Sequence, residues 1–183
     1  MNTQRFIRHL EHEEDDAWLR YIGILGKVRN TNTNELRKEV VRLHQNRGSR
    51  TLMLKSHINA EHLMRAHLED MAYRSRLVEI NIVVSKMFRR LEVTLGAITN
   101  HLVSNYSAYL KETTVHRTKG DINTFVEALL EDGWAEHGAL ESTLDVCKQI
   151  IDDIDKGGWS LRNMVELLKI VAARESVIKS AEI

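Results

Sequence analysis

Apolar residues recur every three or four positions along most of this chain, which is the spacing of one face of an α-helix. The chain contains no proline, and the 47 residues from Ser49 to Leu95 also lack glycine. Because proline and glycine are the strongest local breakers of regular structure, this stretch predicts one very long helix. The whole pattern predicts an all-α fold, a helical bundle with one very long helix that is either straight or bent.

Polar or glycine-containing breaks separate the predicted helices. These helices cover residues 3–29, about 35–47, 49–113, 122–131, 135–156 and 161 onward. A break near Tyr73–Arg76 stays open, because the first half of the long segment is less regular. Gly48, Gly133 and the pair Gly157-Gly158 are expected to end helices, since glycine favours C-terminal caps.

The chain is short enough for one domain, so we expect a single helical domain over residues 1–183. Its expected subdivision is a helical pair at 1–48, the long helix at 49–113 and C-terminal helices at 121–183.

Two apolar stripes are candidate surfaces for self-association. The first follows heptad spacing along the long helix, and the second lies on the last helix. Their candidate oligomerisation residues are Leu77, Val84, Leu91, Ile98 and Leu102, then Leu161, Met164, Leu168 and Val171, with Val177 continuing the second stripe. The alternative for both stripes is that they pack inside one chain as core.

Composition narrows the class of protein. Apolar residues make up 43% and aromatic residues only 5%, which favours a core of Leu, Ile, Val and Met. Cys147 is the single cysteine, so an intrachain disulfide and a four-cysteine zinc site are excluded. The N-terminus has no signal-peptide pattern, and no apolar run approaches a membrane span. We expect a cytoplasmic protein in a reducing compartment, with no membrane association.

The net charge of zero hides a strong asymmetry along the chain. Residues 37–90 carry 12 Lys/Arg against 5 Asp/Glu, net +7, whereas residues 91–183 carry 9 against 15, net −6. The basic segment either contacts phosphates or meets the acidic half, within one chain or between copies. The candidate nucleic-acid-binding residues are Arg47, Arg50, Lys55, Arg65, Arg74, Arg76, Lys86, Arg89 and Arg90.

No pattern predicts a catalytic site, a metal site or a cofactor. A di-metal bundle site needs Glu-x-x-His, and none of the nine histidines has Glu three positions before it. His57 and Glu61 have a ligand-compatible spacing, but that spacing is common. Gly23-Ile-Leu-Gly26-Lys27 lacks the spacing and the hydroxyl residue of a phosphate-binding loop. Cys147 sits in an apolar stripe and is expected to be a small core residue.

Three short pieces near the C-terminus carry a family resemblance. Leu144-Asp-Val-Cys147, Ile151-Asp-Asp-Ile154 and Gly158-Trp-Ser-Leu-Arg-Asn-Met164 resemble the C-terminal helix–glycine–helix of UvsY-type recombination mediators of tailed phages. The resemblance implies a ring-forming accessory protein that binds single-stranded DNA and helps to load a recombinase. The basic N-terminal half has no counterpart in this resemblance.

We therefore predict a non-enzymatic helical assembly or adaptor protein that self-associates and can accompany single-stranded nucleic acid. One alternative is an inhibitor or regulator that binds a single protein partner, with Asp145, Asp152, Asp153 and Asp155 engaging a basic surface. The other alternative is a metal-binding helical-bundle enzyme.

Overall fold

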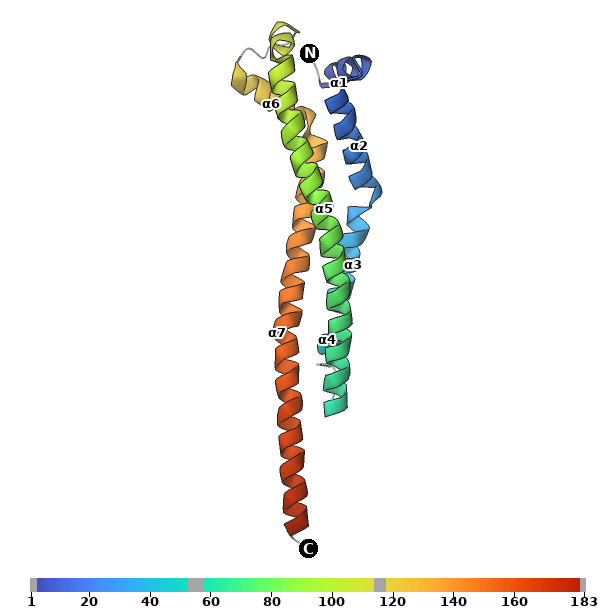
Figure 1. The fold of residues 1–183 in the computed structure, drawn as a ribbon, viewed down its shortest axis with the longest axis vertical. Coiled ribbons are helices and arrows are strands. Elements are labelled where there is room, and N and C mark those ends of the chain that lie inside the picture. The colour runs from blue at the N-terminus through green and yellow to red at the C-terminus, as the bar shows by residue number, and fades with distance from the viewer. Residues whose placement is uncertain (1–2, 53–57, 114–117, 182–183) are drawn as a thin grey trace. The chain divides into compact units, whose positions relative to one another are not determined.

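The structure is a computed structural model, and it describes residues 3–52, 58–113 and 118–181. The side chains of Thr113 and of residues 175–181 lie outside the description. Every regular element in the described ranges is an α-helix, so the predicted all-α fold is confirmed. The helices are α1 (Thr3–His12), α2 (Asp16–Asn30), α3 (Thr33–Gln45), α4 (Gly48–Leu52), α5 (Ala60–Thr113), α6 (Lys119–Leu129) and α7 (Glu131–Ala181) (Figure 1).

The contacts divide the chain into two compact units, each built from distant segments. Unit 1 comprises residues 1–33 and 84–143, and unit 2 comprises residues 34–83 and 144–183. Helices α5 and α7 each contribute one segment to either unit.

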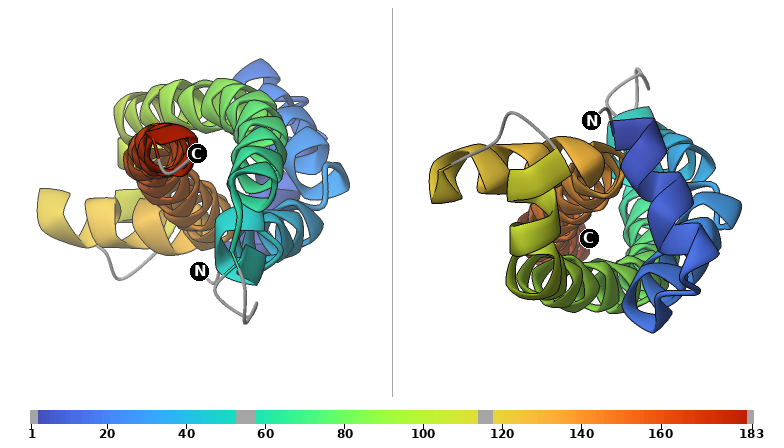
Figure 2. Two further views of the ribbon diagram at one scale, coloured as in Figure 1. Left: turned by 90° about the horizontal axis from the view of Figure 1, so that it is seen from below. Right: turned by 90° about the horizontal axis from the view of Figure 1, so that it is seen from above.

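Unit 1 packs α1, α2 and α6 against the second half of α5 and the beginning of α7. Phe6 of α1 is fully buried, with ring contacts to Tyr106 and Tyr109 of α5 and to Phe125 of α6. Viewed along the long helices, α6 is seen from its side, so it lies across them rather than parallel to them (Figure 2). The unit thus has an aromatic core at the end of α5.

Unit 2 packs α3, α4 and the first half of α5 against the longer part of α7. The buried cluster of Leu52, Leu63, Ala66, Leu161 and Val165 joins α4, α5 and α7. Within this unit α5 and α7 run antiparallel, since Arg74 pairs with Asp155 while His67 lies beside Arg162.

The long helix is confirmed, with two changes to the prediction. It begins at Ala60 rather than near Ser49, and it continues through Tyr73–Arg76 without a break. The segment after Gly48 instead forms the short helix α4. Gly48 is the first residue of α4 and is not the end of a helix. It lies so close to α5 that a side chain would not fit, since an added Cβ would lie 2.6 Å from the carbonyl oxygen of Ala66.

The predicted break at Gly157-Gly158 is wrong, whereas the break expected at Gly133 is present three residues earlier, at Leu130. Helix α7 runs for 51 residues through all three glycines. A Cβ on Gly133 would lie 2.6 Å from the hydroxyl of Tyr21, and one on Gly157 would lie 3.3 Å from Nη2 of Arg47. These two glycines let neighbouring side chains approach the helix closely, which offsets the roughly 1 kcal/mol that glycine costs a helix interior.

The N-terminal helix divides where the sequence predicted continuity. Between α1 and α2, Glu14 has a φ of 50°, and the carboxylate of Asp15 accepts a hydrogen bond from the Trp18 backbone at 2.9 Å. Asp15 is therefore the N-cap of α2. The cap of α6 also differs from the expected Asp121, because Thr118 is the N-cap and Asp121 completes a capping box with it.

Candidate interaction surface

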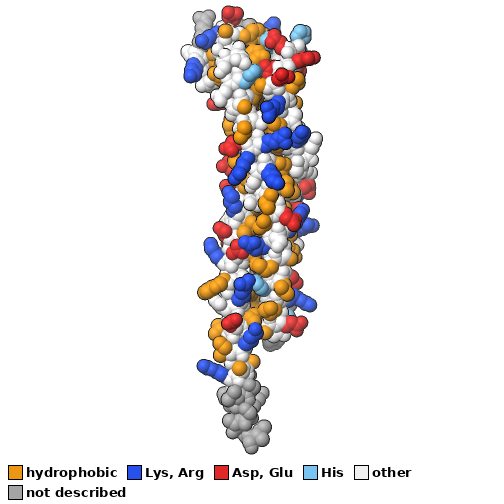
Figure 3. Space-filling model, viewed as in Figure 1, with side chains coloured by type: hydrophobic (Ala, Val, Ile, Leu, Met, Phe, Trp, Pro, Cys, Tyr) orange, Lys and Arg blue, Asp and Glu red, His pale blue; other side chains and the backbone are white. Residues whose placement is uncertain are grey.

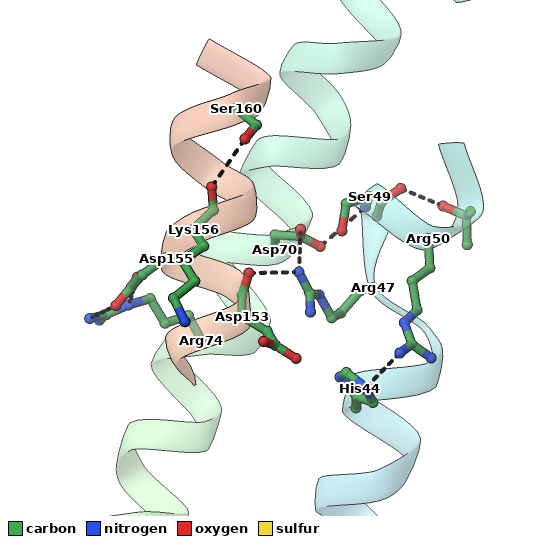
Figure 4. A network of polar contacts seen from close by, with 12 residues as sticks. His44, Arg47, Ser49, Arg50, Asp70, Arg74, Asp153, Asp155, Lys156 and Ser160 are labelled. Atoms are coloured by element: carbon green, nitrogen blue, oxygen red, sulfur yellow. Dashed lines mark hydrogen bonds and ion pairs between the residues drawn. The ribbon is translucent and has the colours of Figure 1, made fainter. Parts of the chain in front are cut away.

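A buried ion pair forms the polar centre of unit 2. Arg47, which is 6% exposed, follows α3, and its Nη2 lies 3.7 Å from Oδ2 of the fully buried Asp70 of α5. The same nitrogen donates to the backbone carbonyl of Asp153 in α7 at 3.3 Å, and the backbone N–H of Ser49 donates to Asp70 at 3.3 Å (Figure 4). The network therefore joins three helices and the turn before α4.

Arg47 is a correction to the sequence analysis. Its guanidinium faces Asp70 and the backbone of α7 instead of solvent, so in this conformation it cannot contact a phosphate. A buried charge needs a compensating partner, and an unpaired buried charge is costly. The role of Arg47 is to hold unit 2 together.

Three more of the candidate cations have partners in unit 2. Arg50 lies 2.7 Å from the imidazole of His44, and Arg74 makes two hydrogen bonds to the Asp155 carboxylate, at 2.6 and 3.0 Å (Figure 4). Arg76 pairs with Glu39 at 2.9 Å and with Glu79 at 3.0 Å. Of these contacts, only the pair of Arg74 and Asp155 joins the basic segment to a carboxylate of the acidic C-terminal half, whereas Arg50 and Arg76 contact residues of the basic segment itself.

These contacts change the proton affinities of the groups involved. Burial and the nearby charges of Arg50 and Arg47 lower the pKa of His44. The hydrogen bonds from Arg74 lower the pKa of Asp155, and the pKa of Arg74 is raised in turn. All three shifts favour the protonation states that maintain the network at neutral pH.

The remaining candidate cations are exposed or outside the description. Arg65 is exposed in unit 2, whereas Lys86, Arg89 and Arg90 are exposed on the α5 segment of unit 1. Lys55 lies outside the described residues.

The candidate oligomerisation residues fall into two groups. Leu77, Val84, Leu91, Ile98 and Leu102 are at most 1% exposed, so they are core within the chain and offer no surface to another copy. The prediction that these five residues mediate oligomerisation is therefore corrected, because other helices of the same chain cover them. On α7, Leu161 is also buried, but Met164, Leu168 and Val171 are exposed. Val177 lies beyond the last described side chain.

An apolar groove lies between α4, α5 and α7 within unit 2. It has a volume of about 640 Å³. Its floor and walls include Leu52, Leu63 and Leu161, and Ser49 and Ser160 supply the two hydroxyl groups among its lining residues. Met164, Leu167 and Leu168 form the rim on α7.

The described side chains of α7 that follow Val165 are exposed on all sides, and two of them, Leu167 and Leu168, also line the groove. Val165 is the last buried residue before Arg174, and every side chain from Glu166 to Arg174 is exposed. Four large apolar residues lie in this stretch: Leu167, Leu168, Ile170 and Val171. Apolar side chains are visible just before the grey C-terminal residues in Figure 3. We call residues 166–174 the α7 tail.

Sequence analysis missed part of this surface. The predicted stripe included Leu168 and Val171 but omitted Leu167, Ile170 and Trp159, which are 62%, 52% and 70% exposed. The signal was the Leu167-Leu-Lys-Ile-Val-Ala-Ala173 run, in which apolar residues occupy more than one face of the helix. Because the prediction assumed that only one face of this helix is apolar, it left out the apolar residues on the other faces.

Unit 1 contains a second polar cluster, centred on Asp15. One oxygen of its carboxylate accepts hydrogen bonds from Tyr106 and from Nε2 of His101, both at 2.8 Å. Nδ1 of His101 lies 3.0 Å from the amide of Asn105. Both ring nitrogens thus have neighbours: Asp15, the N-cap of α2, links α2 to α5, and Asn105 lies one turn along α5 from His101. Burial and the bond to Asp15 raise the pKa of Tyr106.

Two kinds of chemistry considered from the sequence are metal ligation and the reactivity of the single cysteine. No set of three or more His, Cys, Asp or Glu residues in the described ranges is placed to hold a metal ion. Cys147 is fully buried, and burial raises the pKa of its thiol to about 11. No helix in those ranges is both long and apolar enough to cross a lipid bilayer.

Comparison of the chain with protein-family models, with curated proteins and with solved structures finds no match. The resemblance to UvsY-type mediators stays a prediction, and function has to be argued from the surface itself.

Proposed function

We propose that this chain is a non-enzymatic helical assembly protein whose unit 2 binds a second copy of the same chain. The observation that supports this proposal is the concentration of apolar surface on one short part of α7. Six of the sixteen clearly exposed large apolar side chains in the described residues lie between Trp159 and Val171. Scattered apolar residues are normal on a protein surface, whereas a contiguous group indicates a binding site.

The physical argument concerns the cost of leaving this group in water. Burial of apolar area contributes roughly 25 cal/mol per Å², and the α7 tail forgoes that contribution in a single chain. The tail continues a helix of 51 residues, so its helical turns need no new nucleus, but they have no buried side chains to hold them against fraying. A partner that covers the tail therefore stabilises both the apolar contacts and the helix.

A pair of substitutions tests this proposal. Leu167→Glu with Val171→Glu places two charges on the α7 tail, at side chains that are exposed in the single chain. Folding should therefore persist, with an unchanged helical signal by circular dichroism. Association should weaken by at least tenfold, which corresponds to about 1.4 kcal/mol. Light scattering over a concentration series measures this change.

Val93→Glu is the matched control, because Val93 is a 71% exposed apolar residue on α5, in unit 1. It should leave the mass in solution unchanged. A monomeric unmodified chain, or equal weakening by both variants, would overturn the proposed role of the α7 tail.

The same measurement with a single-stranded oligonucleotide tests the association with nucleic acid. That hypothesis now depends on Arg65 in unit 2 and on Lys86, Arg89 and Arg90 in unit 1. A gain of mass that disappears with added salt would support it, since phosphate contacts weaken steeply as counterions compete.

A further inference from the structure

Two histidines in unit 2 each face an arginine. Nε2 of His44 on α3 lies 2.7 Å from a guanidinium nitrogen of Arg50 on α4 (Figure 4). His67 on α5 is placed in the same way, since Nε of Arg162 on α7 donates to its Nε2 at 3.2 Å. The first contact joins α3 to α4, and the second joins α5 to α7.

Both contacts require a neutral imidazole. A guanidinium group donates hydrogen bonds and accepts none, so Nε2 of each histidine has to be the acceptor. A neutral imidazole that accepts at Nε2 carries its proton on Nδ1, whereas a protonated imidazole donates at both nitrogens. Protonation would therefore place two donors and two positive charges against one another in each contact.

The surroundings of the two rings offer little compensation for a second proton. In the described part of the chain, Nδ1 of His44 and Nδ1 of His67 are buried and have no hydrogen-bond partner. Arg47 adds another positive charge near His44, and the carboxylate of Asp153 on α7 opposes it only in part. The ring of His67 packs against Gly158 of α7, where an added Cβ would lie 3.4 Å from it.

The pKa of His44 agrees with this geometry. Burial lowers it, and the charges of Arg50 and Arg47 lower it further. In mild acid the unfolded chain then binds more protons than the folded chain, so stability falls as the pH falls. The loss begins as the pH passes the ordinary histidine pKa of 6.5, and it is complete below the folded pKa of His44.

Both arginines lie beside members of the buried apolar cluster of unit 2. Arg50 belongs to the five-residue helix α4, which places Leu52 in that cluster. Arg162 follows Leu161, which the same cluster includes. Movement of either arginine away from its histidine therefore disturbs the packing of α4, α5 and α7 around the cluster.

We propose that the two arginine–histidine contacts form an acid-sensitive device, in which protonation of His44 and His67 loosens unit 2 and exposes its apolar cluster. The device is independent of self-association, because each contact lies within one chain.

Unit 1 provides an internal comparison, because two of its histidines face carboxylates. Nε2 of His101 lies 2.8 Å from Asp15, and Nε2 of His9 lies 3.7 Å from Glu13. A protonated imidazole donates to a carboxylate and is attracted by its charge. Mild acid should therefore leave these contacts in place while it separates those of unit 2.

Hydrogen–deuterium exchange at about pH 7.5 and about pH 5.5 tests the device in the full chain, because histidine changes its charge in this range while ordinary carboxyl groups stay ionised. After correction for the intrinsic pH dependence of exchange, the backbone amides of residues 61–70 and 158–165 should lose about tenfold in protection at the lower pH. The amides around Leu102, which is fully buried in unit 1, should change by less than about twofold. Equal protection of unit 2 at both pH values would overturn the proposal.

His44→Gln combined with His67→Gln removes the titrating groups but keeps an acceptor for each arginine, since the glutamine side-chain oxygen accepts hydrogen bonds. This double variant should keep its protection in mild acid. His12→Gln is the matched control, because His12 is exposed on α1 in unit 1, and it should lose protection in unit 2 as the unmodified chain does. A pH response of unit 2 that persists in the double variant would contradict the proposal.

The imidazole nitrogen signals of the unmodified chain, measured by NMR, provide a test that needs no substitution. At about pH 7.5 both rings should be neutral with the proton on Nδ1. Protonation of the two rings should then accompany the loss of protection in unit 2. A proton on Nε2 of either neutral ring, or protonation of both rings while unit 2 stays protected, would overturn the proposal even if the double variant does not fold.

Discussion

The two units of this chain differ in how completely they cover their apolar residues. In unit 1, α6 and α1 close the end of α5, and Phe6 is buried among the rings of Tyr106, Tyr109 and Phe125. In unit 2, α7 continues past the buried Val165 and exposes the apolar side chains of the α7 tail, residues 166–174. The apolar stripe of α5 is buried within the chain, whereas α7 has buried residues in both units but none between Val165 and Arg174.

The polar groups of the two units also differ, in how closely each buried charge lies to its partners. In unit 1, Asp15 caps α2 and also accepts hydrogen bonds from His101 and Tyr106, so short hydrogen bonds stabilise the charge of its carboxylate. Unit 2 buries the charges of Arg47 and Asp70 at a longer separation of 3.7 Å. Buried ion pairs of this kind contribute little net stability, yet the loss of one partner is severe.

The largest predicted effect is therefore in unit 2. Asp70→Ala leaves the buried guanidinium of Arg47 without its carboxylate, and we expect the free energy of unfolding to fall by about 3–5 kcal/mol. Urea denaturation monitored by circular dichroism measures this loss. Glu69→Ala is the matched control, because Glu69 is an exposed neighbour on the same helix, and it should change stability by less than about 0.5 kcal/mol. Equal effects of the two variants would contradict the assigned role of the pair.

A pair of glycine substitutions tests the close packing of unit 1. Gly133→Ala places a Cβ 2.6 Å from the Tyr21 hydroxyl and 2.8 Å from Cδ2 of Leu95, and both side chains are fully buried. We expect a loss of about 1–3 kcal/mol, as for other overpacked sites. Gly138→Ala meets no atom within 4 Å and should stabilise the same helix by about 0.5–1 kcal/mol. Thermal unfolding of both variants gives the comparison, and a stabilising Gly133→Ala would refute the packing argument.

The acid stability of unit 1 should depend on Asp15. Burial alone would raise the pKa of this carboxyl, but hydrogen bonds from His101, the Trp18 backbone and Tyr106 outweigh it and lower the pKa below its ordinary value. A depressed pKa in the folded state contributes stability above the unfolded pKa and loses it as the pH falls through the folded pKa. Asp15→Asn should therefore destabilise the protein at pH 7 but much less once the pH has fallen through the folded pKa of Asp15, where the wild-type carboxyl is protonated as well. A pH-independent difference in denaturation midpoint would argue against this assignment.

The smallest predicted effect concerns Arg74. Its pair with Asp155 is partly exposed, so Arg74→Ala should lower the free energy of unfolding by only about 0.2–1 kcal/mol. The double variant with Asp155→Ala should show that the two losses are not additive, which a double-mutant cycle measures. Additive losses would mean that the contact contributes nothing.

The sequence predicted the helical class well, because spacing and the absence of proline act locally. Helix ends were predicted less well. Gly157-Gly158 has the composition of a stop, but Arg47 and His67 pack against those glycines from elsewhere in unit 2. The division between α1 and α2 depends on Asp15, whose partners His101 and Tyr106 are more than 80 residues away.

The candidate surface was predicted only in part, for a related reason. Basic residues such as Arg47 and Arg74 look alike in a sequence, yet their availability depends on carboxylates that folding brings near them. The heptad stripe from Leu77 to Leu102 indicated a helical partner, and the partners turned out to be helices of the same chain. Leu168 and Val171 were predicted as oligomerisation residues from their spacing alone. Spacing cannot show that no other described helix covers this part of α7.

Hydrogen–deuterium exchange at low and high protein concentration tests most directly whether a second copy covers the α7 tail. We predict that the backbone amides of residues 166–174 exchange rapidly in dilute solution and become protected as the concentration rises. The amides around Ile154, which is fully buried within unit 2, should be protected equally in both. Exchange of the tail that is equally rapid at every concentration would contradict self-association through α7.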